Sequence, residues 1–228
     1  MFDFLIGITQ KILAPVFPFP LDASAWGGQI DRLFWMLVVL TGIAFLAVMA
    51  LLGYFILAYR ERPGHRAYYT HGDQRPHLML TTFLSVVVFP FLDVQVERNS
   101  RRYFDFLLNA YPRSEAALRV QVRGEQFAFN FRYPGMDGEF GTDDDAVEPV
   151  LYVPVNRPVV LSMTSKDVIH DFFLPHFRVK QDLVPGIVTS VWFKPTMTTQ
   201  EFREAIGDKK GDFEVACAEL CGIGHTKM

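Results

Sequence analysis

The chain has 228 residues, of which 50% are hydrophobic, 22 are phenylalanine and 21% are charged. This length suffices for one domain plus a membrane anchor or for one larger soluble domain, and the composition excludes a disordered chain, a coiled coil and a collagen-like polymer. The two cysteines exclude a disulfide-dense secreted scaffold, and a net charge of −3 offers no electrostatic footprint for nucleic acid.

The first thirty residues are expected to lie at a membrane interface. Residues 1–20 have no positively charged start and no small-residue cleavage site after a short apolar stretch, so a cleaved signal peptide is not expected. The pattern predicts an amphipathic helix followed by a rigid PVFPFP turn. Residues 1–30 are therefore interpreted as an N-terminal interfacial segment.

A first transmembrane helix is predicted over residues 33–59, which are 27 residues without a charge. A helix needs about 20 apolar residues to cross roughly 30 Å of hydrocarbon, so this run is long enough to span with some tilt. Trp35, Tyr54 and Tyr59 lie near its ends, where aromatic residues meet the membrane interface.

A second apolar run covers residues 78–92 and then meets a polar continuation. Its length is short for a span, so a re-entrant or interfacial segment is the alternative to a helical hairpin. A second cluster of arginines at residues 98–102 weakens the orientation signal, but a hairpin with a cytoplasmic loop is favoured. The connecting loop carries the positive charges that favour it, at Arg60, Arg62, Arg66 and Arg75.

The C-terminal half is predicted to be an all-β domain. Residues 118–133 alternate apolar and polar side chains with period two, as a half-buried strand pair does. Further strands are expected at residues 149–155, 158–165, 187–195 and 213–217, which together suggest a β-sandwich or Greek-key barrel. The predicted domains are the interfacial segment 1–30, a two-helix transmembrane hairpin over 31–106 and an extracytoplasmic domain over 107–228.

An acidic stretch interrupts these strands between residues 133 and 148. It is either a solvated surface loop or part of a negative surface that docks a basic protein partner. The six acidic side chains proposed to dock the partner are Asp137, Glu139, Asp143, Asp144, Asp145 and Glu148.

The last twelve residues carry the chemistry. Two thiols, an imidazole and a thioether form a soft donor set that suits copper. A mononuclear blue-copper site needs only one cysteine, whereas two cysteines four residues apart can bridge two copper ions. The donor residues of this motif are Cys217, Cys221, His225 and Met228.

Two other interpretations of this motif remain open. Cys217 and Cys221 could form a disulfide, which would leave His225 and Met228 unexplained. Structural zinc bound by two cysteines and two histidines would have no use for the methionine.

A second imidazole must come from upstream. His170 follows a predicted strand and is preferred, while His176 is interpreted as a surface or packing residue. The histidines at positions 65, 71 and 77 fall in the loop between the spans, on the opposite side of the membrane.

Over about residues 30 to 228, the sequence resembles subunit II of haem–copper cytochrome c oxidase. The C-x-E-x-C-x₃-H-x₂-M motif matches position for position, and DVIHDFFLPHFRVKQDLVPG resembles the family's DV-x-H segment followed by K-x-D-x-x-P-G. The resemblance implies a cupredoxin domain with a binuclear CuA centre of two copper ions. The implied ligands are His170, Cys217, Glu219 through its main-chain carbonyl, Cys221, His225 and Met228, with the Glu219 side chain pointing toward a magnesium site shared with subunit I.

The implied function is electron transfer within a proton-translocating respiratory oxidase of a bacterial inner membrane. CuA would accept electrons from a soluble or complex-bound cytochrome c on the periplasmic side and pass them to the haem of subunit I, with subunit III as a further partner. The chain itself would carry no oxygen-reducing centre and no catalytic residue. A structural quinol-oxidase-type subunit II, which lacks the copper ligands, and a membrane-anchored copper-delivery protein, which binds one labile copper, are the alternatives.

One departure from the family pattern concerns the surface where electrons enter. The family's tryptophan in G-x-Q-W-Y-W falls on Phe127, which can still pack against a partner haem but leaves the usual route and donor in question. Family members also continue beyond the methionine ligand, so further residues are expected after Met228.

Overall fold

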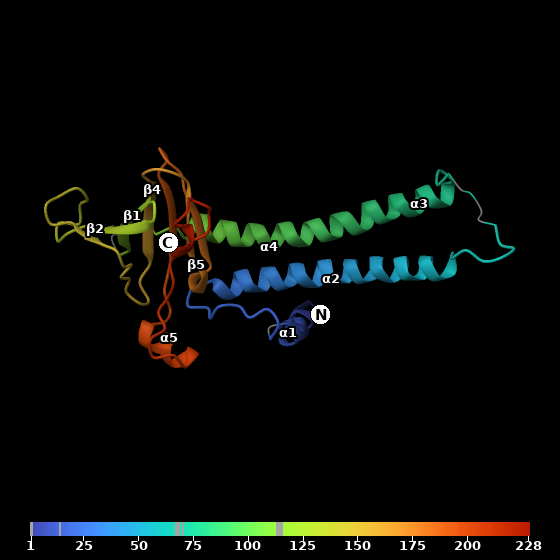
Figure 1. The fold of residues 1–228 in the computed structure, drawn as a ribbon, viewed down its shortest axis with the longest axis horizontal. Coiled ribbons are helices and arrows are strands. Elements are labelled where there is room, and N and C mark those ends of the chain that lie inside the picture. The colour runs from blue at the N-terminus through green and yellow to red at the C-terminus, as the bar shows by residue number, and fades with distance from the viewer. Residues whose placement is uncertain (1, 14, 67–68, 70, 113–115) are drawn as a thin grey trace. The chain divides into compact units, whose positions relative to one another are not determined.

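The computed structural model describes residues 2–13, 15–66, 69, 71–112 and 116–228. These residues form two compact units, one comprising Met1–Pro18 and Asp31–Asn109 and the other Phe19–Ile30 and Ala110–Met228 (Figure 1).

The first unit is helical. Helix α1 spans Phe2–Leu13, α2 spans Gly27–Ala58, and a second long helix comprises α3 (Arg75–Phe83), a π-helical turn (Leu84–Val88) and α4 (Phe89–Asn109). The wide π turn lies where the ring of Pro90 would otherwise clash with the carbonyl of Val86, four residues earlier. The helix therefore continues through the proline instead of ending there.

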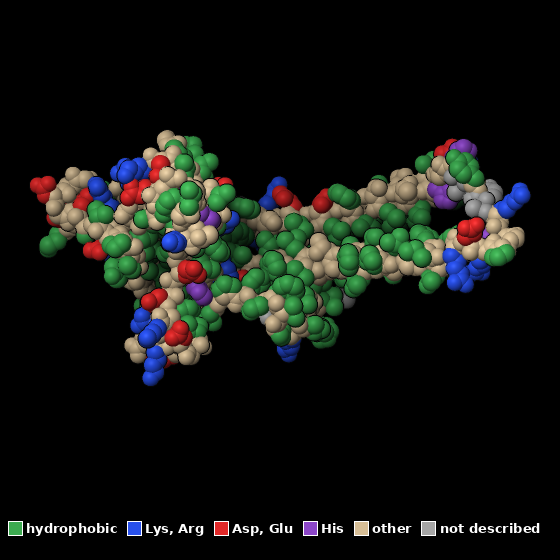
Figure 2. Space-filling view, in the orientation of Figure 1, with side chains coloured by type: hydrophobic (Ala, Val, Ile, Leu, Met, Phe, Trp, Pro, Cys, Tyr) green, Lys and Arg blue, Asp and Glu red, His purple; other side chains and the backbone are tan. Residues whose placement is uncertain are grey.

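Both long helices have the length and composition of membrane spans. An 18-residue stretch of Gly27–Ala58 has a mean hydropathy of 2.6, and one of Arg75–Phe104 has a mean hydropathy of 1.8. At 1.5 Å per residue, each exceeds the roughly 30 Å of a bilayer's hydrocarbon core. Their outward side chains are predominantly apolar along much of their length (Figure 2), which confirms the prediction of two long apolar helices.

Helix α1 packs on the N-terminal part of α2. Ile6 of α1 is buried with Trp35, Met36 and Val39 of α2, and Val96 of α4 contacts the same cluster. The two long helices run antiparallel beside each other (Figure 1). This cluster holds the three helices together.

The second unit consists of two β-sheets. The first has the order β3-β2-β1-β4-β7 and the second the order β6-β5-β8. Strand β1 pairs in parallel with β4 and antiparallel with β2, and the remaining pairs are antiparallel. The strands are β1 (Leu118–Glu125), β2 (Ala128–Tyr133), β3 (Ala146–Glu148), β4 (Val159–Ser165), β5 (His170–Leu174), β6 (Val179–Leu183), β7 (Thr189–Phe193) and β8 (Ala216–Cys217).

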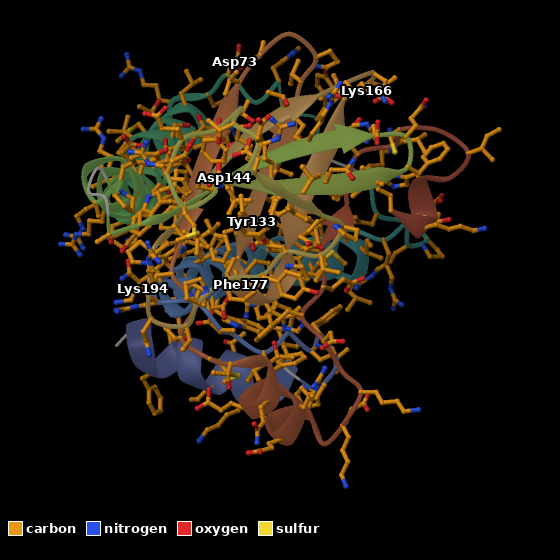
Figure 3. All side chains as sticks on the ribbon, turned by 90° about the vertical axis from the view of Figure 1, so that its left-hand side faces the viewer. Asp73, Tyr133, Asp144, Lys166, Phe177 and Lys194 are labelled. Carbon is orange, nitrogen blue, oxygen red and sulfur yellow. The ribbon has the colours of Figure 1, made fainter. Side chains whose placement is uncertain are left out.

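Alternation along the strands builds the core of this unit. On β1, Val120 and Val122 are buried while Arg119, Gln121 and Arg123 are exposed, as the period-two pattern predicts. Phe131, Leu161 and Phe177 contribute to the same interior, where Figure 3 shows Phe177 among packed side chains. The prediction of an all-β domain after the helices is confirmed.

Two local predictions are wrong. Residues 149–155 form no strand, because no described residue pairs with them in a sheet; they line a groove of about 1080 Å³. The strand expected at residues 213–217 is confined to β8. A short helix, α5 (Thr199–Ile206), was not expected, although Thr198 and Glu201 have the residue types and the spacing of a capping box.

Residues 19–30, which end in the first turn of α2, belong to the β unit. The amide of Ala23 donates to the carbonyl of His176 at 2.8 Å, and the amide of Thr196 donates to the carbonyl of Ala23 at 2.9 Å. The rings of Trp26 and Trp192 meet edge to face with centroids 4.4 Å apart. Ala23 and Trp26 are buried, so residues 19–30 form an integral part of the β unit's core.

Candidate metal centre

The centre forms where β5 and β8 lie side by side. His170 begins β5, and Cys217 of β8 pairs antiparallel with Phe172 of the same strand. The chain then folds back on itself, because the amide of Cys217 donates to the carbonyl of Met228 at 2.9 Å and that of Ala218 to the carbonyl of Asp171 at 3.1 Å. These backbone bonds bring the C-terminal motif against the upstream histidine.

The two cysteines are buried thiols. Their sulfur atoms lie 3.9 Å apart, far beyond the roughly 2.05 Å of a disulfide bond. Burial raises the pKa of the Cys221 thiol, and its interaction with the neighbouring Cys217 adds to this effect. A cation bound between the sulfurs would reverse this effect and favour the thiolates.

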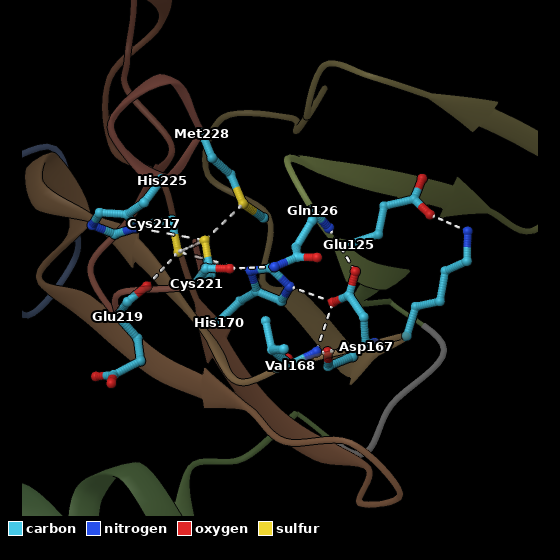
Figure 4. A network of polar contacts seen from close by, with 12 residues as sticks. Glu125, Gln126, Asp167, Val168, His170, Cys217, Glu219, Cys221, His225 and Met228 are labelled. Carbon is cyan, nitrogen blue, oxygen red and sulfur yellow. Dashed lines mark hydrogen bonds and ion pairs between the residues drawn. The ribbon is translucent and has the colours of Figure 1, made fainter. Parts of the chain in front are cut away.

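Four further donor atoms surround the sulfurs (Figure 4). His170 Nδ1 lies 3.9 Å and the carbonyl oxygen of Glu219 lies 3.2 Å from the sulfur of Cys217. His225 Nδ1 lies 3.6 Å and Met228 Sδ lies 3.9 Å from the sulfur of Cys221. All six residues that the sequence predicts as ligands thus come together.

The donor set fits a soft transition metal. The ligand atoms of His170, Cys217 and Cys221 lie within 4.8 Å of one another, and all three residues are buried. Thiolates, imidazoles and a thioether suit copper, whereas zinc would be satisfied by the thiolates and imidazoles alone. The centre is consistent with copper.

The alternative upstream residue, His176, lies away from the sulfurs. Its Nδ1 lies 3.0 Å from the carbonyl of Leu21, and its ring contacts Phe202 and Phe213.

Asp167 orients His170. Its Oδ1 lies 2.8 Å from His170 Nε2, and the carboxylate accepts hydrogen bonds from the amides of Gln126 and Val168 at 2.8 and 2.7 Å. Although burial opposes ionisation, the bonds from Gln126, His170 and Val168 lower the pKa of Asp167 to about 2. The ionised carboxylate holds a proton on Nε2 and leaves the lone pair of Nδ1 for a metal. No role for Asp167 was predicted from the sequence, although it is the aspartate of the DV-x-H segment.

The turn between β1 and β2 covers the metal loop. The ring of Phe127 is 40% exposed and packs on Gly222 and Gly224. A Cβ at Gly224 would lie 2.3 Å from the ring's Cδ2, and one at Gly222 would lie 3.1 Å from its Cε1. The two glycines are thus required by the ring, a role that their spacing in the motif does not reveal.

The acidic stretch forms the loop between β2 and β3, and its side chains do two different things. Asp144 accepts hydrogen bonds from the amide of Met136 at 2.7 Å and from Thr142 at 2.8 Å, and these bonds lower its pKa. Asp145 accepts from the amide of Gly141 at 2.7 Å, and its side chain is 7% exposed. These two residues hold the loop's own conformation. Asp137 also accepts a hydrogen bond from the amide of Glu139 at 2.9 Å. The four other acidic residues of the stretch are all exposed; they are Asp137, Glu139, Asp143 and Glu148.

The chain is similar to several known proteins. The model of the family "Cytochrome C oxidase subunit II, periplasmic domain" matches residues 137–228. The chain is 30% identical over 232 residues to the alternative cytochrome c oxidase subunit 2 of Bradyrhizobium diazoefficiens, covering 90% of this chain and 75% of that one. It is 40% identical over 111 residues to cytochrome c oxidase subunit 2 of Thermostichus vulcanus, covering 49% of this chain and 28% of that one.

A solved structure is also similar. The periplasmic domain of subunit II of cytochrome oxidase from Bradyrhizobium japonicum is 32% identical, with a TM-score of 0.39, and the match covers 51% of this chain and 81% of that one. The similarity to the Bradyrhizobium diazoefficiens subunit and the family match over the metal loop together identify the family of this chain. It belongs to the cytochrome c oxidase subunit II family and is a subunit of a cytochrome c oxidase.

Proposed function

We propose that the β unit holds a binuclear CuA centre and that the chain is the subunit through which electrons enter its oxidase. When bound, the two copper ions would supply one-electron redox chemistry between a cytochrome c and the haem of subunit I, where oxygen is reduced to water. One observation carries the proposal, namely the way in which the donor atoms are divided around the two sulfurs.

Each sulfur is flanked by one imidazole nitrogen and one weaker donor, at 3.2–3.9 Å. The sulfurs lie only 3.9 Å apart, so both can face the same two cations. Two equivalent half-sites that share two thiolates suit a pair of copper ions better than one. The proposed ligands are His170, Cys217, Glu219 through its carbonyl oxygen, Cys221, His225 and Met228.

The protein's part is to keep this geometry constant during electron transfer. Cys217 and Cys221 are buried, which excludes water from the sulfurs. Asp167 fixes the ring of His170 and its proton on Nε2, so that imidazole has no need to rotate or exchange a proton when the charge of the centre changes. A rigid donor set of this kind suits fast one-electron transfer.

Two membrane spans and a periplasmic domain are the proposed topology. The helices Gly27–Ala58 and Arg75–Phe104 would cross a bacterial inner membrane, with residues 1–18 at its interface and residues 19–30 in the β unit. Arginines in the intervening loop favour a cytoplasmic position for it, and the residues after about 107 would then be periplasmic.

The proposed partners are subunit I, subunit III and a soluble or complex-bound cytochrome c. The Glu219 carbonyl faces Cys217, while its exposed carboxylate points away from the sulfurs (Figure 4). This carboxylate is free to contribute to a magnesium site completed by subunit I.

Copper content and EPR of the full chain in detergent test the proposal. We expect two copper ions per chain and the seven-line hyperfine pattern of one electron shared by two equivalent copper nuclei. Cys217→Ser should abolish this pattern, because only one bridging thiolate remains. Ala216→Ser, which introduces serine next to the thiolate without removing it, is the matched control.

A single copper ion per wild-type chain with a four-line spectrum would contradict the proposal and favour a copper-delivery protein. A chain that binds no copper would favour a structural, quinol-oxidase-type subunit. Survival of the seven-line pattern in Cys217→Ser would also refute a thiolate-bridged pair.

A further inference from the structure

Gln126 contacts both segments that carry the metal ligands. It lies at the turn between β1 and β2, where its backbone amide donates to Asp167 Oδ2 at 2.8 Å. Its side-chain Nε2 donates to the carbonyl oxygen of Cys221 at 2.5 Å. Asp167 in turn holds His170, so one residue connects the upstream histidine segment to the C-terminal metal loop (Figure 4).

The glycine at position 222 makes this contact possible. A Cβ there would lie 2.9 Å from the Gln126 Nε2 atom, closer than side chains normally approach. Gly222 also has a φ of 135°, a conformation in which other residues are strained. The loop is therefore shaped to admit the amide group of Gln126 next to Cys221.

We infer that Gln126 is a positioning residue of the metal centre, which holds the two ligand segments together and raises the reduction potential through its hydrogen bond to Cys221. This inference rests on the proposed copper function. The role belongs to the hydrogen-bonding amide group of Gln126, and a side chain of the same size without that group would not fill it.

The direction of the hydrogen bond from Gln126 to Cys221 explains why the reduction potential should rise. An N–H group that points at the carbonyl of a thiolate ligand places the positive end of its dipole toward the metal centre. Reduction adds an electron, so this dipole stabilises the reduced state more than the oxidised state and raises the potential. Removing the donor should lower the potential, and replacing it with a carboxylate should lower it further.

Two substitutions separate this role from simple packing. Gln126→Glu keeps the shape of the side chain but replaces the donor with a negative acceptor, while Gln126→Leu removes the polar group. If the donor matters, the reduction potential of the copper-loaded full chain should fall in the order wild type, Gln126→Leu, Gln126→Glu. If only packing matters, Gln126→Leu should keep the wild-type potential, because the negative charge of Gln126→Glu lowers the potential with or without the native hydrogen bond.

Copper release provides a second measurement. Because outer partners of metal ligands typically contribute 10- to 100-fold to metal affinity, both variants should release copper to a chelator at least about tenfold faster than wild type. Gln121→Leu is the matched control, since Gln121 is an exposed residue of β1. Glu125→Gln is a second control, since it breaks the Lys166 ion pair beside the same turn.

Thermal unfolding of the copper-free variants checks their fold; Gln126 is exposed, so unfolding temperatures close to that of wild type are expected. Wild-type potentials and release rates in both Gln126 variants, or a Gln126→Leu potential equal to wild type, would overturn the inference and leave the copper function standing. A wild-type chain without the two-copper signal would overturn both.

Discussion

Asp167 and His170 share a hydrogen bond of 2.8 Å between Oδ1 and Nε2, while the other ring nitrogen of His170 faces the sulfur of Cys217 at 3.9 Å. The carboxylate and the proposed metal thus lie on opposite sides of one imidazole. This arrangement fixes the tautomer of a metal-binding histidine from outside the ligand set.

We therefore predict that Asp167→Ala lowers copper affinity by about 10- to 100-fold, because the ring of His170 loses the group that orients it. Asp167→Asn, whose amide oxygen can still accept the Nε2 proton, should lose less. Competition with a copper chelator measures both, and Asp143→Ala is the control for loss of an exposed aspartate. Equal affinity of Asp167→Ala and wild type would show that His170 is positioned by its strand alone.

A second prediction concerns Gly224 and the Phe127 ring. Gly224→Ala would place a methyl group 2.3 Å from Cδ2 of the ring, whereas the backbone there, with a φ of −90°, accepts any residue. The ring must move, which should destabilise the unit by about 1–3 kcal/mol and slow electron transfer from cytochrome c. Denaturant unfolding and stopped-flow reduction measure the two effects.

Gly53→Ala is the control for this change, because a Cβ at Gly53 meets nothing within 4 Å. If electrons enter through Phe127, Phe127→Ala should slow reduction as well while leaving two copper ions bound. Unchanged reduction rates in both Gly224→Ala and Phe127→Ala would place the donor elsewhere.

The third prediction concerns the acidic loop. Asp144 and Asp145 hold the loop's conformation, so their neutralisation would confound docking with folding. Glu139→Gln combined with Asp143→Asn removes two exposed charges instead, and should slow reduction by a soluble basic cytochrome c at low salt. Long-range steering raises association rates and is screened over about 8–10 Å at moderate ionic strength, so the difference should vanish at high salt.

Stopped-flow reduction across an ionic-strength series measures this effect. Glu61→Gln combined with Asp73→Asn removes the same charge from the loop between α2 and α3 and is the control. Identical rates of the loop variant and wild type at every salt concentration would mean that the acidic stretch is only a solvated loop.

The fourth prediction concerns residues 19–30, which complete the core of the β unit. Trp26→Ala would remove a ring that is 2% exposed and packs against Trp192, and should cost about 3–5 kcal/mol of stability. Phe17→Ala, at an exposed ring, should cost little. Chemical denaturation of the full chain, followed by fluorescence, measures both.

A related expectation follows for soluble fragments. A fragment of residues 110–228 lacks Ala23 and Trp26, so it should unfold at a lower denaturant concentration than the same fragment with residues 19–30 joined to it. Equal midpoints would show that the N-terminal segment adds nothing to the β unit.

Much of this molecule follows from patterns that are local in the sequence. Uncharged apolar runs predict the two long helices, because a helix in hydrocarbon must be apolar over about 20 residues. Alternation over residues 118–133 predicts β1 and β2, because successive side chains of a strand face opposite sides. The spacing of Cys217 and Cys221 on one loop predicts a shared metal site, and their sulfurs do lie together.

Other features depend on residues far apart in the chain. Residues 149–155 have the composition of a strand, but a strand also needs a pairing partner, and none of the described residues provides one. Strand β5 is buried on both faces, so it shows no alternation that could have predicted it.

The surroundings of the metal centre were likewise decided by the tertiary structure. Gln126 reaches Cys221 across 95 positions of sequence, and Ala23 joins a core formed mainly by residues beyond 117. The proposed ligands could be named from the sequence because metal chemistry restricts residue type and spacing. Their supporting contacts could not, because a hydrogen bond or a ring against a glycine depends only on where the folded backbone brings two residues together.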